Sequence, residues 1–195
     1  MNRSADIERK TRETHITLSL NLDGTGLSSI DTDIPFLGHM LELMAAHGFI
    51  DITVKTRGDI EIDYHHTVED LGICIGMAIK KALGDKRAIK RYGQAIIPMD
   101  EALAQVVIDI SNRPYLSYEV LLNKTTVGKF DVDILKEFFK GLVNHAGITM
   151  HITLFTGSDA HHSAEAIFKA FARALDRASQ REERLSGVPS TKGIL

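Results

Sequence analysis

The sequence predicts an α+β fold built by internal duplication, with two similar halves, mostly antiparallel sheets, and helices layered between or against them. The first observation is that the pattern His-His-x-x-Glu occurs twice, at residues 65–69 and 161–165. The second is that segments with two-residue alternation, typical of strands, are followed in each half by segments with helical spacing. We expect the halves to span residues 1–93 and 94–195 and to pack into one compact unit.

The repeat extends beyond the paired motif in both directions. The segment 39–47 aligns with 137–145, and the segment that begins at Glu13 aligns with the one that begins at Glu101. Only the loop 123–133 breaks the register. A duplication of the whole unit explains these matches better than two independent motifs.

Local patterns predict the elements of each half. In the first half, polar and apolar side chains alternate as in strands, helical spacing recurs twice, and Gly48 and Gly84 end the helices. The second half repeats this order and ends in a loop or tail. The predicted elements are strands at 14–22, 50–55 and 60–63, helices at 36–47 and 66–83, then strands at 103–110, 115–122 and 148–155, and helices at 132–145 and 161–184.

Composition limits the class of protein. The chain has 195 residues, of which 44% are hydrophobic and 25% charged, with a net charge of -3 and one cysteine, Cys74. This charge does not favour nucleic acid as a partner, and no apolar run is long enough to span a membrane. A lone cysteine inside an apolar run is interpreted as a buried structural thiol, and no disulfide can form within one chain. We therefore expect a soluble, cytoplasmic protein.

Histidine is distributed unevenly along the chain. Eight of the nine histidines fall in two windows, 39–66 and 145–162. Residues four apart on a helix share a face, so His65 with Glu69, and His161 with Glu165, each offer an imidazole and a carboxylate to one ion. The second histidine of each pair points about 100° away and cannot easily reach the same ion.

The two motifs therefore predict two metal sites, each completed by a histidine from the other motif, in this chain or in another subunit. Mixed imidazole and carboxylate ligands suit Mn, Fe, Co, Ni or Zn, and the sequence does not choose among them. The alternative is a pair of helix N-termini with surface histidines. The recurrence of the motif in a duplicated frame, with His39, His47, His145 and His151 nearby, favours metal binding.

Several further motifs occur in one order over nearly the whole chain. They are RKTRET at 9–14, NLDGTG at 21–26, HML at 39–41, HGF at 47–49, DYHHTVED at 63–70, PMDEA at 98–102, NRPY at 112–115, HHSAEA at 161–166 with FKA at 168–170, and PSTKG at 189–193. With these motifs the chain resembles the imidazoleglycerol-phosphate dehydratases of histidine biosynthesis. Its length matches the dehydratase unit alone, so we expect the monofunctional form.

The resemblance implies an Mn²⁺ cofactor, with two ions per active site. The ligand positions of the family correspond here to His39, His65, His66, Glu69, Glu137, His161, His162 and Glu165. Two positions depart from the family pattern: Glu137, where many members have histidine, and Gly38, where aspartate is common. Glu137 either binds the metal as a carboxylate or lies outside the layer of ligands, and Gly38 bears on how His39 is oriented.

The resemblance also implies a substrate site. Its positions correspond to Glu13, His39, His47, His65, Glu69, Arg91, Arg113, His161, Lys169, Ser190 and Lys192. Arginine, lysine and serine side chains suit a phosphate group. The reaction removes water from imidazole glycerol phosphate to give imidazole acetol phosphate. The hydrogen that is lost lies on a carbon with no carbonyl beside it, so a simple base would not remove it. The resemblance implies that the metals hold the imidazole as an imidazolate, which expels the hydroxyl and forms a diazafulvene.

Glu13 is the candidate catalytic residue, because a carboxylate can alternate between acid and base. The resemblance further implies a homo-oligomer of 24 subunits built from trimers, with active sites between protomers. The competing hypothesis is a non-catalytic metal-binding or metal-storage protein, since helical His and Glu motifs also build di-iron sites. Strand content and the phosphate-type cations weigh against it.

Overall fold

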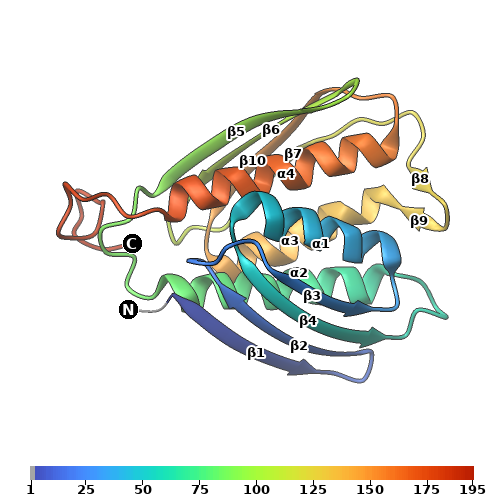
Figure 1. The fold of residues 1–195 in the computed structure, drawn as a ribbon, viewed down its shortest axis with the longest axis horizontal. Coiled ribbons are helices and arrows are strands. Elements are labelled where there is room, and N and C mark those ends of the chain that lie inside the picture. The colour runs from blue at the N-terminus through green and yellow to red at the C-terminus, as the bar shows by residue number, and fades with distance from the viewer. Residues whose placement is uncertain (1–2) are drawn as a thin grey trace.

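Two four-stranded sheets enclose a layer of four helices in residues 3–195, the part of the chain that the computed structural model describes (Figure 1). The first sheet has the strand order β1-β2-β4-β3. Its strands β1, β2 and β4 pair antiparallel, and β3 pairs parallel with β4. The bounds are β1 Ser4–Lys10, β2 Thr14–Asn21, β3 Ser28–Thr32 and β4 Asp51–Gly58.

The second sheet repeats this arrangement. Its order is β5-β6-β10-β7, with two antiparallel pairs and a parallel pair of β7 with β10. A small hairpin of β8 and β9 lies apart from it. The bounds are β5 Tyr92–Met99, β6 Ala102–Asp109, β7 Tyr115–Glu119, β10 Thr149–Thr156, β8 Thr126–Val127 and β9 Phe130–Asp131. The same order and the same pairing directions in both sheets support the predicted duplication.

The helices fill the space between the sheets (Figure 1). Their bounds are α1 Pro35–Gly48, α2 His65–Leu83, α3 Leu135–Ala146, which follows a short 3₁₀ turn at Val132–Ile134, and α4 Ala160–Ser179. Proline at the start of α1 suits a position whose N–H needs no helical partner. Asp159 caps α4, because its side chain accepts hydrogen bonds from the backbone N–H groups of His161 and His162.

Close helix packing forms the centre of the core. Phe138, Phe139, Phe168 and Phe171 are fully buried, and adjacent rings in this group lie 5.2–5.5 Å apart between α3 and α4. Helix α2 approaches α3 through Gly72, where an added Cβ would lie only 2.1 Å from the carbonyl oxygen of Phe138. The inward residues of the sheets complete the core, as their alternating burial shows.

The predicted fold class and most predicted elements are confirmed, with some corrections. Residues 60–63 are not a strand: they form a turn in which Ile62 is 68% exposed and pairs with no neighbouring strand. Helix α4 ends at Ser179 rather than at residue 184, because Glu182 donates its backbone N–H to Ala88 and Arg181 pairs with Ile89. The strand predicted at 115–122 ends at Glu119, and the pattern also missed the strands β1, β3, β5, β8 and β9.

The lone cysteine and the helices also agree with what the composition predicts. Cys74 is a free, buried cysteine, and burial raises the pKa of its thiol to about 12, which agrees with a structural role. Within residues 3–195, no helix combines the length and the apolar character needed to cross a membrane.

Candidate metal centre

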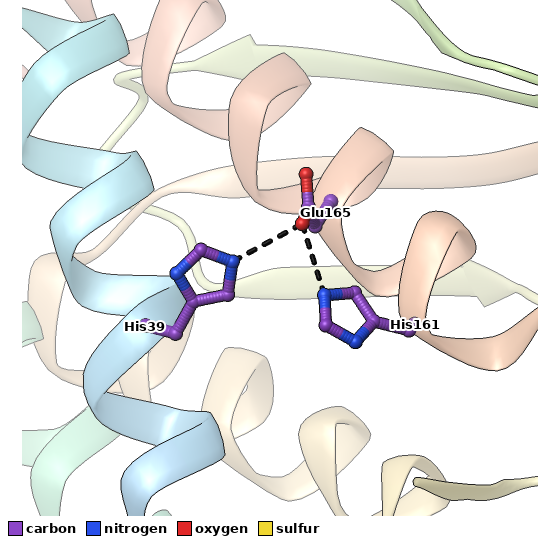
Figure 2. Close-up of side chains that lie close together, drawn as sticks. All are labelled: His39, His161 and Glu165. Carbon is purple, nitrogen blue, oxygen red and sulfur yellow. Dashed lines mark hydrogen bonds and ion pairs between the residues drawn. The ribbon is translucent and has the colours of Figure 1, made fainter.

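Three predicted ligands meet between α1 and α4. His39 on α1 and His161 on α4 both direct their Nε2 atoms at one oxygen, Oε1 of Glu165, at 3.1 Å and 3.0 Å (Figure 2). The donor atoms of this group all lie within 4.8 Å of one another, and no other group of three His, Cys, Asp or Glu residues in the described chain does so. The two helices come from different halves of the duplication.

Local structure explains the geometry of this group. His161 and Glu165 are four residues apart on α4 and share a face, as their spacing predicts. The ring of Phe36 packs edge-on against His161, with 5.3 Å between the ring centroids. The departure at Gly38 does not turn His39 away, because His39 points at Glu165 and its Nδ1 lies 3.8 Å from Glu42.

The carboxylate of Glu165 is ionised at neutral pH. Burial alone would raise the pKa of Glu165, but hydrogen bonds from Lys169 and His39 and the charge of Lys169 lower it to about 2. The Lys169 ammonium lies 2.6 Å from Oε2, the oxygen that does not face the histidines. Two imidazole nitrogens with a carboxylate oxygen are ligands suited to Mn, Fe, Co or Zn. With three protein ligands, positions stay open for substrate or for further ligands.

The second motif gives a looser pair. Nε2 of His65 lies 3.5 Å from Oε2 of Glu69 on α2. Glu137 does not join this pair: it bonds Lys140 one turn along α3, at 2.8 Å. A pocket of about 510 Å³ lies beside His65, and Tyr64, Lys129 and other residues line it. This pocket offers room for a small molecule next to the second motif.

The second histidine of each motif faces a different carboxylate. His66 contacts Asp59 through Nδ1 at 3.0 Å, and His162 contacts Glu101 through Nδ1 at 2.9 Å. These hydrogen bonds raise the pKa of both histidines. The pKa of Glu101 is lowered to about 2 by the hydrogen bond from His162 and by backbone donors. Sequence reasoning missed Asp59, which lies between β4 and the misassigned segment 60–63. It used Glu101 as a position in the repeat and in the motif at 98–102, and not as a partner of His162.

Glu13 lies beside the start of α2. Its Oε1 is 4.0 Å from Nε2 of His66, and its side chain is 53% exposed. The next residue, Thr14, donates its hydroxyl to Asp70, which also pairs with Arg9. Through Thr14 and Asp70, strand β2 is fixed to α2, so Glu13 is held near the histidine motif while its carboxylate stays accessible.

His47 and Lys169 line the contact between α1 and α4. The pKa of His47 is lowered by burial and by the charges of Lys169 and Arg173. Lys169 also lies 3.2 Å from the sulfur of Met99 on β5. Both residues therefore lie near Glu165, on the same helices as the three converging ligands.

The remaining predicted phosphate ligands gather elsewhere. Arg91 makes two hydrogen bonds to Asp109, at 2.7 Å and 3.1 Å, and a third to the carbonyl of Pro189 at 2.8 Å. The hydrogen bond to Asp109 raises the pKa of Arg91. Arg113 lies 3.8 Å from the same aspartate. Ser190 follows Pro189 and accepts the N–H of Lys192 at 3.2 Å, so the tail and both arginines form one basic cluster.

This basic cluster and the histidines lie at opposite ends of α4. The backbone N–H of Arg91 bonds the carbonyl of Ala178 in the last turn of α4, whereas His161 is in its first turn. At the rise of an α-helix, these positions are roughly 25 Å apart. Figure 1 shows the same separation, because α2 and α4 begin at one end of the molecule and the C-terminal tail lies at the other. One copy of the chain does not bring all the predicted site residues together.

The duplicated sheets and the helix-borne His and Glu groups define an α+β protein in which His39 from one half lies beside His161 and Glu165 from the other. Residues 32–175 match the family model described as imidazoleglycerol-phosphate dehydratase. Proteins of that name from Geobacter metallireducens and Geobacter sulfurreducens are each 56% identical to this chain over the full length of both sequences.

Solved structures give the same result. The imidazoleglycerol-phosphate dehydratase from Staphylococcus aureus superposes with a TM-score of 0.83 at 41% identity, covering 92% of this chain and 99% of that one. The enzyme from Pyrococcus furiosus gives a TM-score of 0.85 at 38% identity, covering 97% and 100%. The chain belongs to the imidazoleglycerol-phosphate dehydratase family, the hydro-lyases of histidine biosynthesis.

Proposed function

We propose that the chain catalyses the Mn²⁺-dependent dehydration of imidazole glycerol phosphate to imidazole acetol phosphate, with two metal ions per active site. The observation that carries this proposal is the convergence of His39, His161 and Glu165, from two halves of the molecule, on one point. Family membership supplies the reaction, and the converging donors supply a place for the metal.

The residues proposed to hold the metal extend beyond this group. Glu165, Glu69 and Glu137 offer carboxylate oxygens, and the remaining ligands are imidazoles, a set that suits Mn²⁺. Bound metal would act as a Lewis acid toward the imidazole of the substrate and stabilise its anionic form. The proposed ligands are His39, His65, His66, Glu69, Glu137, His161, His162 and Glu165.

Glu13 is proposed to carry the proton transfers. Dehydration requires that a hydroxyl leave one side-chain carbon and a proton leave its neighbour, and the resulting enol becomes the ketone. Glu13 is half exposed, next to His66, and makes no hydrogen bond through its carboxylate in residues 3–195. A carboxylate in this position is free to accept the proton and to return one to the departing hydroxyl.

The site is proposed to be shared between copies of the chain. A phosphate held by Arg91, Arg113, Ser190 and Lys192 cannot reach the histidines of the same copy across roughly 25 Å. A neighbouring copy can bring its basic cluster to the histidine end. This requirement supports a homo-oligomer, proposed to be a shell of 24 subunits built from trimers.

The first test is turnover. Purified protein incubated with Mn²⁺ and imidazole glycerol phosphate is expected to form the ketone, whereas metal binding without ketone would favour a metal-storage role. Glu13→Gln is expected to keep metal and substrate binding but to lose turnover, as for a group engaged mainly in the transition state. Near-normal turnover in this variant would remove Glu13 from the mechanism.

The second test mixes inactive variants. His161→Ala and Arg91→Ala damage opposite ends of the chain, so mixed oligomers assembled from both contain some sites in which both ends are intact. Random mixing of equal amounts restores about a quarter of the sites. His161→Ala mixed with His39→Ala is the control, because both changes lie in one cluster and no site regains both. Equal recovery in the two mixtures, or none in the first, would contradict the shared site.

A further inference from the structure

Two carboxylates hold the second histidine of each motif in the same way. Oδ2 of Asp59 lies 3.0 Å from Nδ1 of His66, and Oε2 of Glu101 lies 2.9 Å from Nδ1 of His162. A carboxylate only accepts hydrogen bonds, so it fixes the hydrogen on Nδ1 and leaves the lone pair on Nε2. Nε2 is then the nitrogen that each ring can offer to a metal.

The two carboxylates do not occupy equivalent positions in the duplicated halves. Glu101 directly precedes β6, and the residue that directly precedes the equivalent strand β2 is Glu13. Asp59 directly follows β4, and its counterpart in the second half is Ser158. The residues just before them, Gly58 and Gly157, are equivalent because they approach the equivalent residues Thr67 and Ser163. The contact with Nδ1 of the second histidine is therefore made by the residue before β6 in the second half and by the residue after β4 in the first half.

The side chain at this position explains why the halves differ. The first half has the carboxylate of Asp59 at this position, whereas the second half has the shorter, uncharged side chain of Ser158. Glu101 makes the contact there instead. Its other oxygen accepts the backbone N–H of Asp159 at 2.9 Å and lies 3.4 Å from the hydroxyl of Ser158, which holds the carboxylate in place.

In the first half the contact from Asp59 changes what Glu13 does. With Nδ1 of His66 occupied by Asp59, Glu13 lies 4.0 Å from the opposite nitrogen, Nε2, beyond hydrogen-bond range. The backbone N–H of Asp59 donates to the carbonyl of Glu13 at 3.1 Å, so the two residues are linked while the Glu13 carboxylate stays unengaged. The Glu101 carboxylate, by contrast, is fully used.

We propose that Asp59 and Glu101 are positioning residues that orient the second histidine of each motif toward a metal ion, and that Asp59 releases Glu13 from the role that Glu101 keeps. This inference rests on the proposed function for the identity of the metal. It explains why, of two equivalent glutamates in a duplicated frame, only one is available for proton transfer.

The first test compares Mn²⁺ affinities by isothermal titration calorimetry of the metal-free full-length protein. Glu101→Gln retains the size of the side chain, but its amide cannot accept hydrogen bonds from both His162 and Asp159. We expect Glu101→Gln and Asp59→Asn to weaken Mn²⁺ binding by about 10–100-fold, the usual cost of losing a partner of a ligating histidine. Glu13→Gln is expected to change Mn²⁺ affinity less than about 3-fold. The exposed Glu61→Gln is the matched control.

The second test reads the rings directly and needs neither metal nor turnover. Nitrogen NMR of metal-free, ¹⁵N-histidine-labelled protein, at a pH where the rings are neutral, distinguishes hydrogen on Nδ1 from hydrogen on Nε2. His162 is expected to carry hydrogen on Nδ1 in the unaltered protein and to lose that preference in Glu101→Gln. A general loss of folding would not produce this selective change, because His66 should keep its preference in that variant.

Three results would overturn the inference. They are an unchanged His162 tautomer in Glu101→Gln, an unchanged Mn²⁺ affinity in both Glu101→Gln and Asp59→Asn, and a loss of affinity in Glu13→Gln as large as in Glu101→Gln. Failure of the proposed function looks different: the unaltered protein then binds Mn²⁺ without forming ketone, or binds none. The tautomer comparison still decides the positioning roles in either case.

Discussion

Replacing Gly72 by alanine tests the helix packing on which the site depends. Alanine is favoured over glycine inside a helix by about 1 kcal/mol. At Gly72, however, the new Cβ would lie 2.1 Å from the carbonyl oxygen of Phe138 and 3.0 Å from its Cα, and neither atom belongs to a side chain that can rotate away. Restoring ordinary contact requires α2 and α3 to separate by roughly 1 Å.

Overpacking of this kind costs about 1–3 kcal/mol, or more when backbone must move. We therefore expect Gly72→Ala to lower the free energy of unfolding despite the gain in helix propensity. Gly38→Ala is the matched control, because Gly38 is also a buried helical glycine but its Cβ would meet only the Thr32 and Ile30 side-chain methyls at 3.1 Å and 3.6 Å. The half-buried Thr32 can give way, so Gly38→Ala is expected to be neutral or slightly stabilising.

The assay is urea denaturation of metal-free protein at one concentration, followed by far-UV circular dichroism. The two variants should differ by about 2–3 kcal/mol, with Gly38→Ala the more stable. Equal stability of the two variants would show that α2 and α3 do not approach as closely as described. A Gly72→Ala protein that folds is also expected to bind Mn²⁺ more weakly, because α2 carries His65 and Glu69.

Three further predictions concern metal and pH. Glu69→Gln is expected to lower Mn content and activity together, because an amide is a poorer ligand than a carboxylate. Metal analysis and ketone formation measure the two effects, and full Mn occupancy in this variant would contradict the role of Glu69 as a ligand. The pKa values of His66 and His162 are raised above 6.5, so their stabilisation of the metal-free protein is fully present below that pH and is lost as pH rises through the folded values. The Tm of metal-free protein should therefore decline as pH rises above 6.5, and it should decline less in Asp59→Asn. Chelation is expected to shift the assembly toward trimers and Mn²⁺ to restore the large particle, measured by size-exclusion chromatography with light scattering; a large particle that persists unchanged without metal argues against metal at the interfaces.

Patterns within one element were read correctly from the sequence. The helical period places His161 and Glu165 on one face whatever surrounds the helix, and it turns His162 toward a different neighbour. Residues 60–63 show where such reading fails. Their alternation resembles that of a strand, but a strand also needs a neighbouring strand to pair with. Strand β4 ends at Gly58, and residues 60–63 pair with no strand of either four-stranded sheet.

The sequence alone determined the duplication, because the two halves share a pattern. It also determined the four helices and the pairing of histidine with glutamate four residues on, because each depends on residues close together in the chain. Only the tertiary structure decided that His39 meets the motif on α4, and that Asp59 rather than Glu13 holds His66. It also decided that Arg91 lies at the opposite end of α4 from His161. These contacts join residues far apart in the chain. They follow from how closely the helices pack and from which side chains then meet, and a one-dimensional pattern contains neither.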